Sequence, residues 1–379
     1  TGYGRLYCDY HGWGGEFPKT QIMWAKQLEI SSADSEMCYW YMNSLDYVKN
    51  LIIIDPRASA YATRAGLWIQ PRPGTDCALA LGMGHVIIEE ELWDKDFVEN
   101  WTFGFDDYRE RVKEWTPEKV SDVCWIPKEQ IIEAARMWAV DTPGTIQVGS
   151  SLERQANCGH TIRAITCLMG LAGNIERPGS MISWVLPDTG LIEDFNLELP
   201  ITDEMKAKII GGDRFKMGAT RTCNPDTMVK AINSGNAPIR VWFSVGGQQI
   251  VHMANTKEVV EAIEKVEFMA HADQFMGPMA EAADIVLPAA HWLELDDVYD
   301  MHPRFMIEAH NKVVDPPGEA KSDAWIFNEI GRRVVPDKWW DSVEDMLDYE
   351  LRRGESKDGG PLKWNEFAEK LVSGCWGPD

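Results

Sequence analysis

The stretch LIIIDPR, residues 51–57, joins four apolar residues to an aspartate, a proline and an arginine. A short apolar run that ends at such polar residues is typical of a buried strand in a parallel sheet. A carboxylate at the strand end, here Asp55, accepts hydrogen bonds from ligands, and an adjacent arginine, here Arg57, can clamp a phosphate. The alternative is a loop cap beside a surface cation, and these residues alone leave both interpretations open.

Apolar runs and segments of helical periodicity alternate on both sides of this stretch. Strands are predicted at residues 20–24, 51–54, 67–69, 146–148, 241–245, 268–270 and 285–287. Helices are predicted at residues 77–91, 128–140, 161–171, 256–265, 320–334 and 341–352, and a helix-like segment at 34–49. Asp76 is predicted to cap the helix at 77–91. Residues 176–225 are rich in Gly and Pro and are predicted to form irregular loops.

This alternation predicts an α/β fold with two Rossmann-like domains, each with a mainly parallel sheet, joined by long irregular loops. We expect a first cofactor-binding domain at residues 1–175 and a second at 176–318. Residues 319–379 are expected to form a helical tail that leads to a further domain outside this sequence.

The composition narrows the function classes. The chain has 379 residues, 45% hydrophobic and 26% charged, which is typical of a globular protein. Its net charge of -23 argues against nucleic-acid binding, because such proteins must neutralise phosphates. No apolar run approaches the ~20 residues of a membrane helix, so we expect a soluble chain, cytoplasmic or periplasmic. The eight cysteines include no Cys-x-x-Cys pair, which argues against a local zinc or iron-sulfur site.

Small and polar residues also follow the other predicted strands. No Gly-x-Gly-x-x-Gly motif follows a strand, so the usual dinucleotide fingerprint is missing. Gly74 precedes a predicted helix N-terminus, which favours an anion, although a capping Asp76 would occupy the same amide donors. A large nucleotide-like ligand fits this repeated pattern. The residues that follow the remaining strands are Gly149, Gly246, Gly247, Gln248, Asp273 and Gln274.

Several stretches together resemble the catalytic subunits of the molybdopterin oxidoreductase family, of the dimethyl sulfoxide reductase type. The sequence HWLE at 291–294 is most similar to the branch with acetylene hydratase and hydroxyl-transferring enzymes. The matching stretches, in family order, are LIIIDPR at 51–57, AGLWIQPRPGTDCALA at 65–80, GHVIIEE at 84–90, LAGNIERPG at 171–179, HADQFM at 271–276 and AEAADIVLP at 280–288.

The resemblance implies a bis-molybdopterin guanine dinucleotide cofactor that holds molybdenum or tungsten. The family's Gly-x-Asn-Pro after a second-domain strand is replaced here by GGQQ at 246–249. By resemblance, one half of the cofactor is assigned to Asp55, Arg57, Gly74, Asp76 and Gly149. The other half is assigned to Gly246, Gly247, Gln248, Asp273 and Gln274.

The resemblance also places a metal-ligating side chain shortly before the first strand. Cys8 is the candidate thiolate ligand, since soft sulfur suits a metal in a dithiolene field, and Asp9 and His11 are candidates for proton transfer. The alternative is that Cys8 is an ordinary loop cysteine. An iron-sulfur cluster and a C-terminal barrel domain are expected outside this sequence, which begins with Thr1 and is interpreted as the central part of a larger subunit.

Two functions from different classes follow. The first is an enzyme of anaerobic respiration that performs metal-centred oxo-transfer, redox or hydration chemistry on a small molecule. Its expected partners are an iron-sulfur electron-transfer subunit and a membrane-anchor subunit. The second is a cofactor-free structural subunit of a respiratory complex. The altered GGQQ favours the second function, whereas the polar residues kept at the strand ends favour the enzyme.

Overall fold

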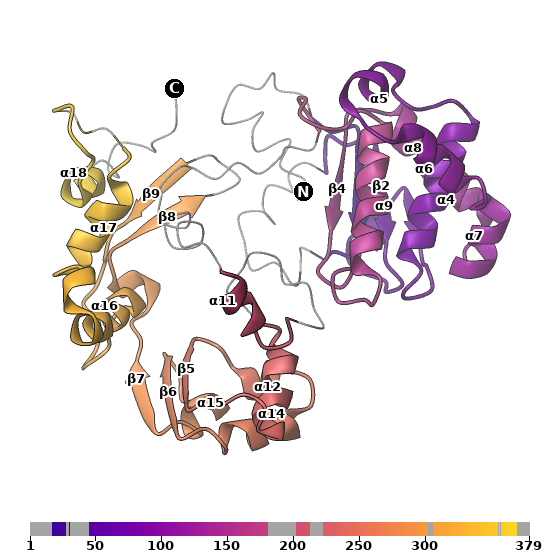
Figure 1. Cartoon of the computed structure of the whole chain (residues 1–379). Helices are drawn as coiled ribbons and strands as arrows, with labels where there is room; N and C mark the ends of the chain where they lie inside the picture. Colours follow the sequence, from indigo (N-terminus) through magenta and orange to yellow (C-terminus); the bar gives the residue numbers. More distant parts are fainter. Residues whose placement is uncertain are drawn as a thin grey trace. The chain divides into compact units, whose positions relative to one another are not determined.

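The chain forms two units, each built around a parallel sheet (Figure 1). The computed structural model describes residues 17–27, 30, 45–180, 202–212, 223–301, 306–354, 356 and 358–369. The two compact units are Thr1–Val185 and Leu186–Asp379. The α/β fold with mainly parallel sheets is therefore confirmed, whereas the domain bounds 1–175, 176–318 and 319–379 stay a prediction.

The first unit has a four-stranded parallel sheet in the order β3-β2-β1-β4. Its strands are β1 (Thr20–Trp24), β2 (Asn50–Ile54), β3 (Leu67–Ile69) and β4 (Gly144–Val148). All four are predicted from the sequence, and β2 and β4 begin one and two residues earlier than expected. Strand β1 lies in the middle of the sheet and β3 and β4 at its edges, so the segments that follow all four strands leave from one edge.

Alternate side chains of these strands pack on opposite faces of the sheet, as the pleat requires. Ile22, Ile52 and Ile146 contribute to the larger core, which the helices of this unit cover (Figure 1). Met23 and Ile53 point to the other face and pack with a smaller cluster around Tyr61. Burial on both faces explains why Leu51–Ile54 of β2 is a continuous apolar run in the sequence.

Six α-helices accompany this sheet in the described residues. They are α4 (Asp76–Glu89), α5 (Lys95–Trp101), α6 (Phe105–Val112), α7 (Pro117–Cys124), α8 (Lys128–Val140) and α9 (Cys158–Leu171). The helix predicted at 161–171 begins one turn earlier, at Cys158. Helices α5, α6 and α7 are not predicted from the sequence, because each is only seven or eight residues long. The segment 34–49 lies largely outside the described residues.

The second unit has a three-stranded parallel sheet in the order β5-β6-β7. The strands are β5 (Val241–Val245), β6 (Phe268–Asp273) and β7 (Ile285–Pro288). Strand β6 is three residues longer than predicted, so Asp273 is its last residue. A core that includes Trp242 of β5 packs α12 (Pro225–Ser234), α14 (Thr256–Ile263) and α15 (Pro278–Glu281) against this sheet.

The rest of the second unit contains the two helices predicted at 320–334 and 341–352, together with elements that the sequence does not reveal. An antiparallel pair, β8 (Asp297–Met301) and β9 (Met306–His310), packs with α17 (Val343–Leu351) and α18 (Trp364–Glu369). Phe327 of α16 (Asp323–Val334) contacts Phe243 of β5. The prediction of irregular loops throughout 176–225 is wrong at α11 (Asp203–Ala207), which Thr202 caps.

Other short elements in the described residues are α13 (Gln249–His252) and the 3-10 helices η1 (Ala62–Arg64), η2 (Trp292–Glu294) and η4 (Pro336–Lys338), with an isolated bridge between Ala289 and Lys321. No helix in the described part of the chain has the length and apolarity needed to cross a bilayer.

Candidate functional site

The four strands of the first unit end in one row. Trp24 of β1 pairs with Ile54 of β2 and with Val148 of β4, and Ile54 pairs with Ile69 of β3. The residues that follow these ends therefore lie at the carboxyl edge of the sheet, where ligands bind in open α/β sheets. The residues in this row are Gln70, Asp55, Ala25 and Gly149.

Asp55 lies at the centre of this row and is only 8% exposed. Its Oδ1 accepts the backbone N–H of Arg57 at 2.8 Å, and its Oδ2 accepts the amide of Gln27 at 3.4 Å. Two donors leave lone pairs on the carboxylate, which has about four acceptor sites. The side chain of Arg57 is exposed to solvent. The strand end thus presents a partly satisfied carboxylate beside a cation.

The backbone around residue 149 leaves no room for a side chain, so this position requires glycine. A Cβ at this position would lie 1.6 Å from the carbonyl oxygen of Ala25. The N–H of Gly149 donates to the carbonyl of Trp24 at 2.9 Å, so the ends of β1 and β4 are held together here. From the sequence, the small residue is expected to leave room for a ligand. The described contacts show that the close neighbour is the chain itself.

Asp76 does not cap α4, which corrects the sequence prediction. The N-cap is Thr75, and Asp76 is the first residue of the helix. Its buried carboxylate accepts the indole N–H of Trp24 at 2.9 Å through Oδ1 and the amide of Gln155 at 3.1 Å through Oδ2. Because these donors come from distant parts of the chain, Asp76 ties the start of α4 to β1 and to the loop after β4.

We expect Asp76→Ala to lower the free energy of unfolding by about 2–3 kcal/mol, because it leaves the buried indole N–H of Trp24 without an acceptor. Urea denaturation measures this loss. Asp76→Asn is the matched control, since its amide oxygen still accepts the bond and the loss should be smaller. In a Trp24→Phe background the effect of Asp76→Ala should shrink, and an unchanged effect would contradict the role of this bond.

Gly74 lies at the rim of a cavity of about 600 Å³ beside the first turn of α4. Its φ of +86° is in the left-handed region that favours glycine, and apart from its chain neighbours no atom of the described residues lies within 4 Å of the position of a Cβ. The same cavity is lined by Asn157 at the N-terminus of α9 and by the arginines Arg111 and Arg163. The backbone at Gly74 is therefore open to a ligand.

The carboxyl edge of the second sheet carries a similar arrangement. Gly246 directly follows β5 with a φ of +59°, and in the described part of the chain only its own chain neighbours come within 4 Å of the position of a Cβ. Its N–H donates to the carbonyl of Ala272 in β6 at 2.9 Å. At Gly247 a Cβ would meet the side chain of Gln249, which in turn accepts the hydroxyl of Ser244 at 3.0 Å. The turn after β5 thus has an open glycine followed by a crowded one.

Asp273 is the centre of a hydrogen-bond network at this edge. Its Oδ2 accepts the amide of Gln248 at 2.8 Å and lies 3.2 Å from Nε2 of His271. Its Oδ1 accepts the N–H of Phe275 at 3.1 Å. Burial favours the neutral acid, but the hydrogen bonds outweigh burial and hold the pKa of Asp273 below its usual range. Gln274 donates its amide to the carbonyl of Ala290 at 3.2 Å.

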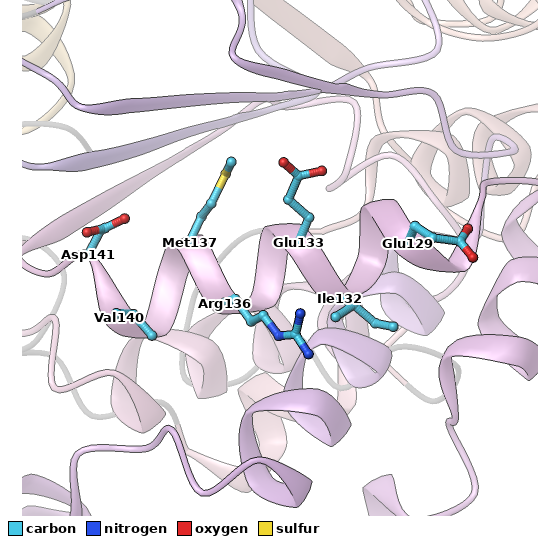
Figure 2. A pocket seen from close by; sticks show the side chains of 7 residues that line it. All are labelled: Glu129, Ile132, Glu133, Arg136, Met137, Val140 and Asp141. Atoms are coloured by element: carbon cyan, nitrogen blue, oxygen red, sulfur yellow. The ribbon is translucent and has the colours of Figure 1, made fainter.

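A groove along α8 contains none of the residues at the two strand edges. Figure 2 shows its seven lining side chains, all from α8 and the residue after it. The groove has a volume of about 540 Å³ and ends at Asp141. The carboxylate of Asp141 binds Lys49 and Asn50, which lie at the start of β2. The groove therefore reaches the amino edge of the sheet, opposite the strand ends, and carries none of the predicted site residues.

The sequence predicts a metal ligand and two proton-transfer residues near the start of the chain. Cys8, Asp9 and His11 lie outside the described residues and stay predictions. Within the described residues, no group of three or more His, Cys, Asp or Glu side chains is placed to hold a metal ion. The carboxylates and accessible backbone at the two strand edges suit a ligand with N–H groups instead, because carboxylate oxygens accept hydrogen bonds.

A family model for molybdopterin oxidoreductases matches residues 29–333. The chain belongs to the molybdopterin oxidoreductase family. This confirms the assignment that the motifs at the strand ends suggest. Membership implies a molybdopterin cofactor with molybdenum or tungsten.

Members of the molybdopterin oxidoreductase family align with most of the chain. Acetylene hydratase from Syntrophotalea acetylenica is 29% identical over 352 residues, which cover 85% of this chain and 47% of that protein. The F420-dependent formate dehydrogenase subunit alpha of Methanocaldococcus jannaschii is 30% identical over 319 residues, which cover 82% of this chain and 47% of that protein. The chain thus spans about half the length of these relatives.

The structure of acetylene hydratase from Pelobacter acetylenicus has the same fold. It superposes with a TM-score of 0.81 at 23% identity, over 99% of this chain and 55% of that protein. The similarity covers both units, and it supports the α/β architecture predicted for a molybdopterin oxidoreductase.

Two polar partners at the edges, Gln155 and His271, are not among the predicted site residues. Gln155 bonds to Asp76, and His271 contacts Asp273. His271 begins the stretch HADQFM that resembles the family, and its position two residues before Asp273 places both side chains on one face of a strand. No local signal connects Gln155 to Asp76, because they are 79 residues apart.

Proposed function

We propose that this chain is the part of a catalytic subunit that binds two molybdopterin guanine dinucleotides around one molybdenum or tungsten atom. Each unit would bind the nucleotide end of one of them. The whole protein would catalyse metal-centred redox, oxo-transfer or hydration chemistry on a small substrate.

The observation that carries this proposal is the pair of carboxylates at the strand ends. Asp55 follows β2 and accepts two N–H groups from the described residues, which leaves about two of its acceptor sites. Asp273 ends β6, where several donors orient a carboxylate that stays 13% exposed at the edge of its sheet. Guanine offers adjacent N–H donors, which match an ionised carboxylate. Gly74 and Gly246 add backbone that a ligand can approach. These residues fit a guanine dinucleotide.

In this proposal the chain's own residues bind the cofactor and orient it. Asp55 and Asp273 accept hydrogen bonds from the bases, and the open backbone at Gly74 and Gly246 lies against the phosphates or ribose. When bound, such a group supplies two-electron redox and Lewis-acid chemistry. Cys8 would ligate the metal, and Asp9 and His11 would move protons near the substrate.

The relatives' names support an enzyme with partner subunits. One relative, from Salmonella typhimurium, is named the molybdopterin-containing subunit PhsA of thiosulfate reductase, and another is a formate dehydrogenase subunit alpha. We therefore propose that the whole protein carries an iron-sulfur cluster in another part of the same subunit. Its proposed partners are an iron-sulfur electron-transfer subunit and a membrane-anchor subunit.

The contact of Gln248 weakens the case for a cofactor-free structural subunit. The GGQQ sequence is the feature that favours that alternative. Its first glutamine donates to Asp273 at 2.8 Å and accepts the N–H of Met279 at 3.3 Å. The altered sequence thus keeps an amide that holds the strand-end carboxylate, which a purely structural subunit would not need.

Elemental analysis of the full-length protein, purified without oxygen, tests the proposal. We expect about one atom of molybdenum or tungsten per chain and about two guanine nucleotides per metal atom after acid hydrolysis. A protein with neither metal would contradict the proposal. Metal without guanine nucleotide would contradict the dinucleotide assignment alone.

A further inference from the structure

His271 is a fully buried polar side chain in the second sheet. It lies in β6 with 0% exposure, between Ser244 of β5 and Val286 of β7 in the strand register. Its Nε2 is 3.2 Å from Oδ2 of Asp273. Because its partner is a carboxylate oxygen, which accepts, Nε2 donates the hydrogen of this bond.

Nδ1 of His271 has no hydrogen-bond partner among the described residues. An unsatisfied buried polar atom costs about 1–3 kcal/mol, and an apolar side chain of similar size at this position would avoid that cost. The neighbouring hydroxyl of Ser244 is directed to Gln249 and Gly247 instead. A contribution to stability therefore does not explain a histidine here.

The contact of His271 with Asp273 gives a better explanation for a histidine at this position. Asp273 has its Oδ2 between the Nε2 atoms of Gln248 and His271, and its Oδ1 on the N–H of Phe275. Gln248 is itself fixed, because its Oε1 accepts the N–H of Met279. Three donors thus set the direction of one carboxylate whose side chain is 13% exposed.

We propose that His271 is a positioning residue that orients Asp273 toward the guanine of the pterin cofactor, at the expense of stability. This inference rests on the proposed function. His271 is fully buried and acts only through the carboxylate. A carboxylate that is already oriented binds more tightly, because no rotamer freedom is lost when the ligand arrives.

Substitutions in the full-length protein test this role. His271→Phe fills the same space and removes both Nε2, which donates to Asp273, and the unpartnered Nδ1. We expect its cofactor-free form to melt at the wild-type temperature or above, while the pterin and metal contents fall about fivefold. Thermal unfolding, pterin fluorescence after oxidative release, and elemental analysis provide these readouts.

Two substitutions of His271 by amide side chains form a matched pair for the same test. The side-chain nitrogen of His271→Gln reaches as far as Nε2 and should restore cofactor content. That of His271→Asn corresponds to Nδ1, falls short of Asp273 and should not. Equal cofactor content in the Gln and Asn variants would overturn the inference, as would wild-type content with Phe. Wild-type protein without pterin would overturn the proposed function itself, and this inference with it.

Discussion

Replacing Asp273 by alanine is expected to lower the pterin and metal content of the full-length protein about tenfold or more. The substitution removes the carboxylate on which Gln248, His271 and Phe275 converge, and with it the proposed acceptor for the guanine. A hydrogen bond to a charged group contributes about 1.5–3 kcal/mol, which corresponds to about a tenfold to hundredfold change in affinity. Elemental analysis and released guanine nucleotide measure the change.

Glu267→Gln is the matched control for this experiment. Glu267 precedes β6, at the opposite edge of the same sheet, where it forms an exposed bidentate pair with Arg240. Exposed pairs contribute little to stability, so this variant should keep both its fold and its cofactor. Wild-type cofactor content in Asp273→Ala would remove this residue from the site, and an equal loss in Glu267→Gln would point to a general effect on the unit.

The second large effect is expected for Gly149→Ala. The added methyl group would lie 1.6 Å from the carbonyl oxygen of Ala25 and 2.5 Å from its carbonyl carbon. Backbone atoms cannot rotate away, so β1 and β4 would have to separate at the edge of the sheet. We expect a loss of about 3 kcal/mol or more in the free energy of unfolding, or failure to fold.

Gly159→Ala distinguishes this clash from a general intolerance of alanine. Gly159 lies in the first turn of α9, and outside this helix no described residue has an atom within 4 Å of the position of an added Cβ. Alanine should leave the stability unchanged or raise it by about 0.4–1 kcal/mol, because it restricts the unfolded chain. Urea denaturation of both variants gives the comparison. A Gly149→Ala protein as stable as wild type would show that the edge can adjust.

The sheets are predictable because their strands carry strong local signals. Ile22–Trp24 and Leu51–Ile54 are apolar runs, and their strands are buried on both faces, as a sheet covered on both sides requires. Asp55 and Gly149 stand out because each directly follows such a run. The position of these residues at one edge then follows from the parallel topology alone.

Other features depend on contacts that a local pattern does not contain. Asp76 has the residue type and position of an N-cap, but its carboxylate binds Trp24, which is 52 residues earlier. Tertiary contact outweighs the capping preference. The antiparallel strands β8 and β9 lack a clear alternation of apolar residues. Cys8, Asp9 and His11 rest on the family resemblance alone.

The bond between Trp24 and Asp76 also makes this edge observable in solution. Trp24 is one of 17 tryptophans and has no exposed surface. A buried, bonded indole hydrogen exchanges with solvent only when the surrounding structure opens. Its exchange rate would therefore report how often β1 and the start of α4 separate, at an edge that the proposed cofactor would occupy. Cofactor binding could thus be followed through one indole resonance.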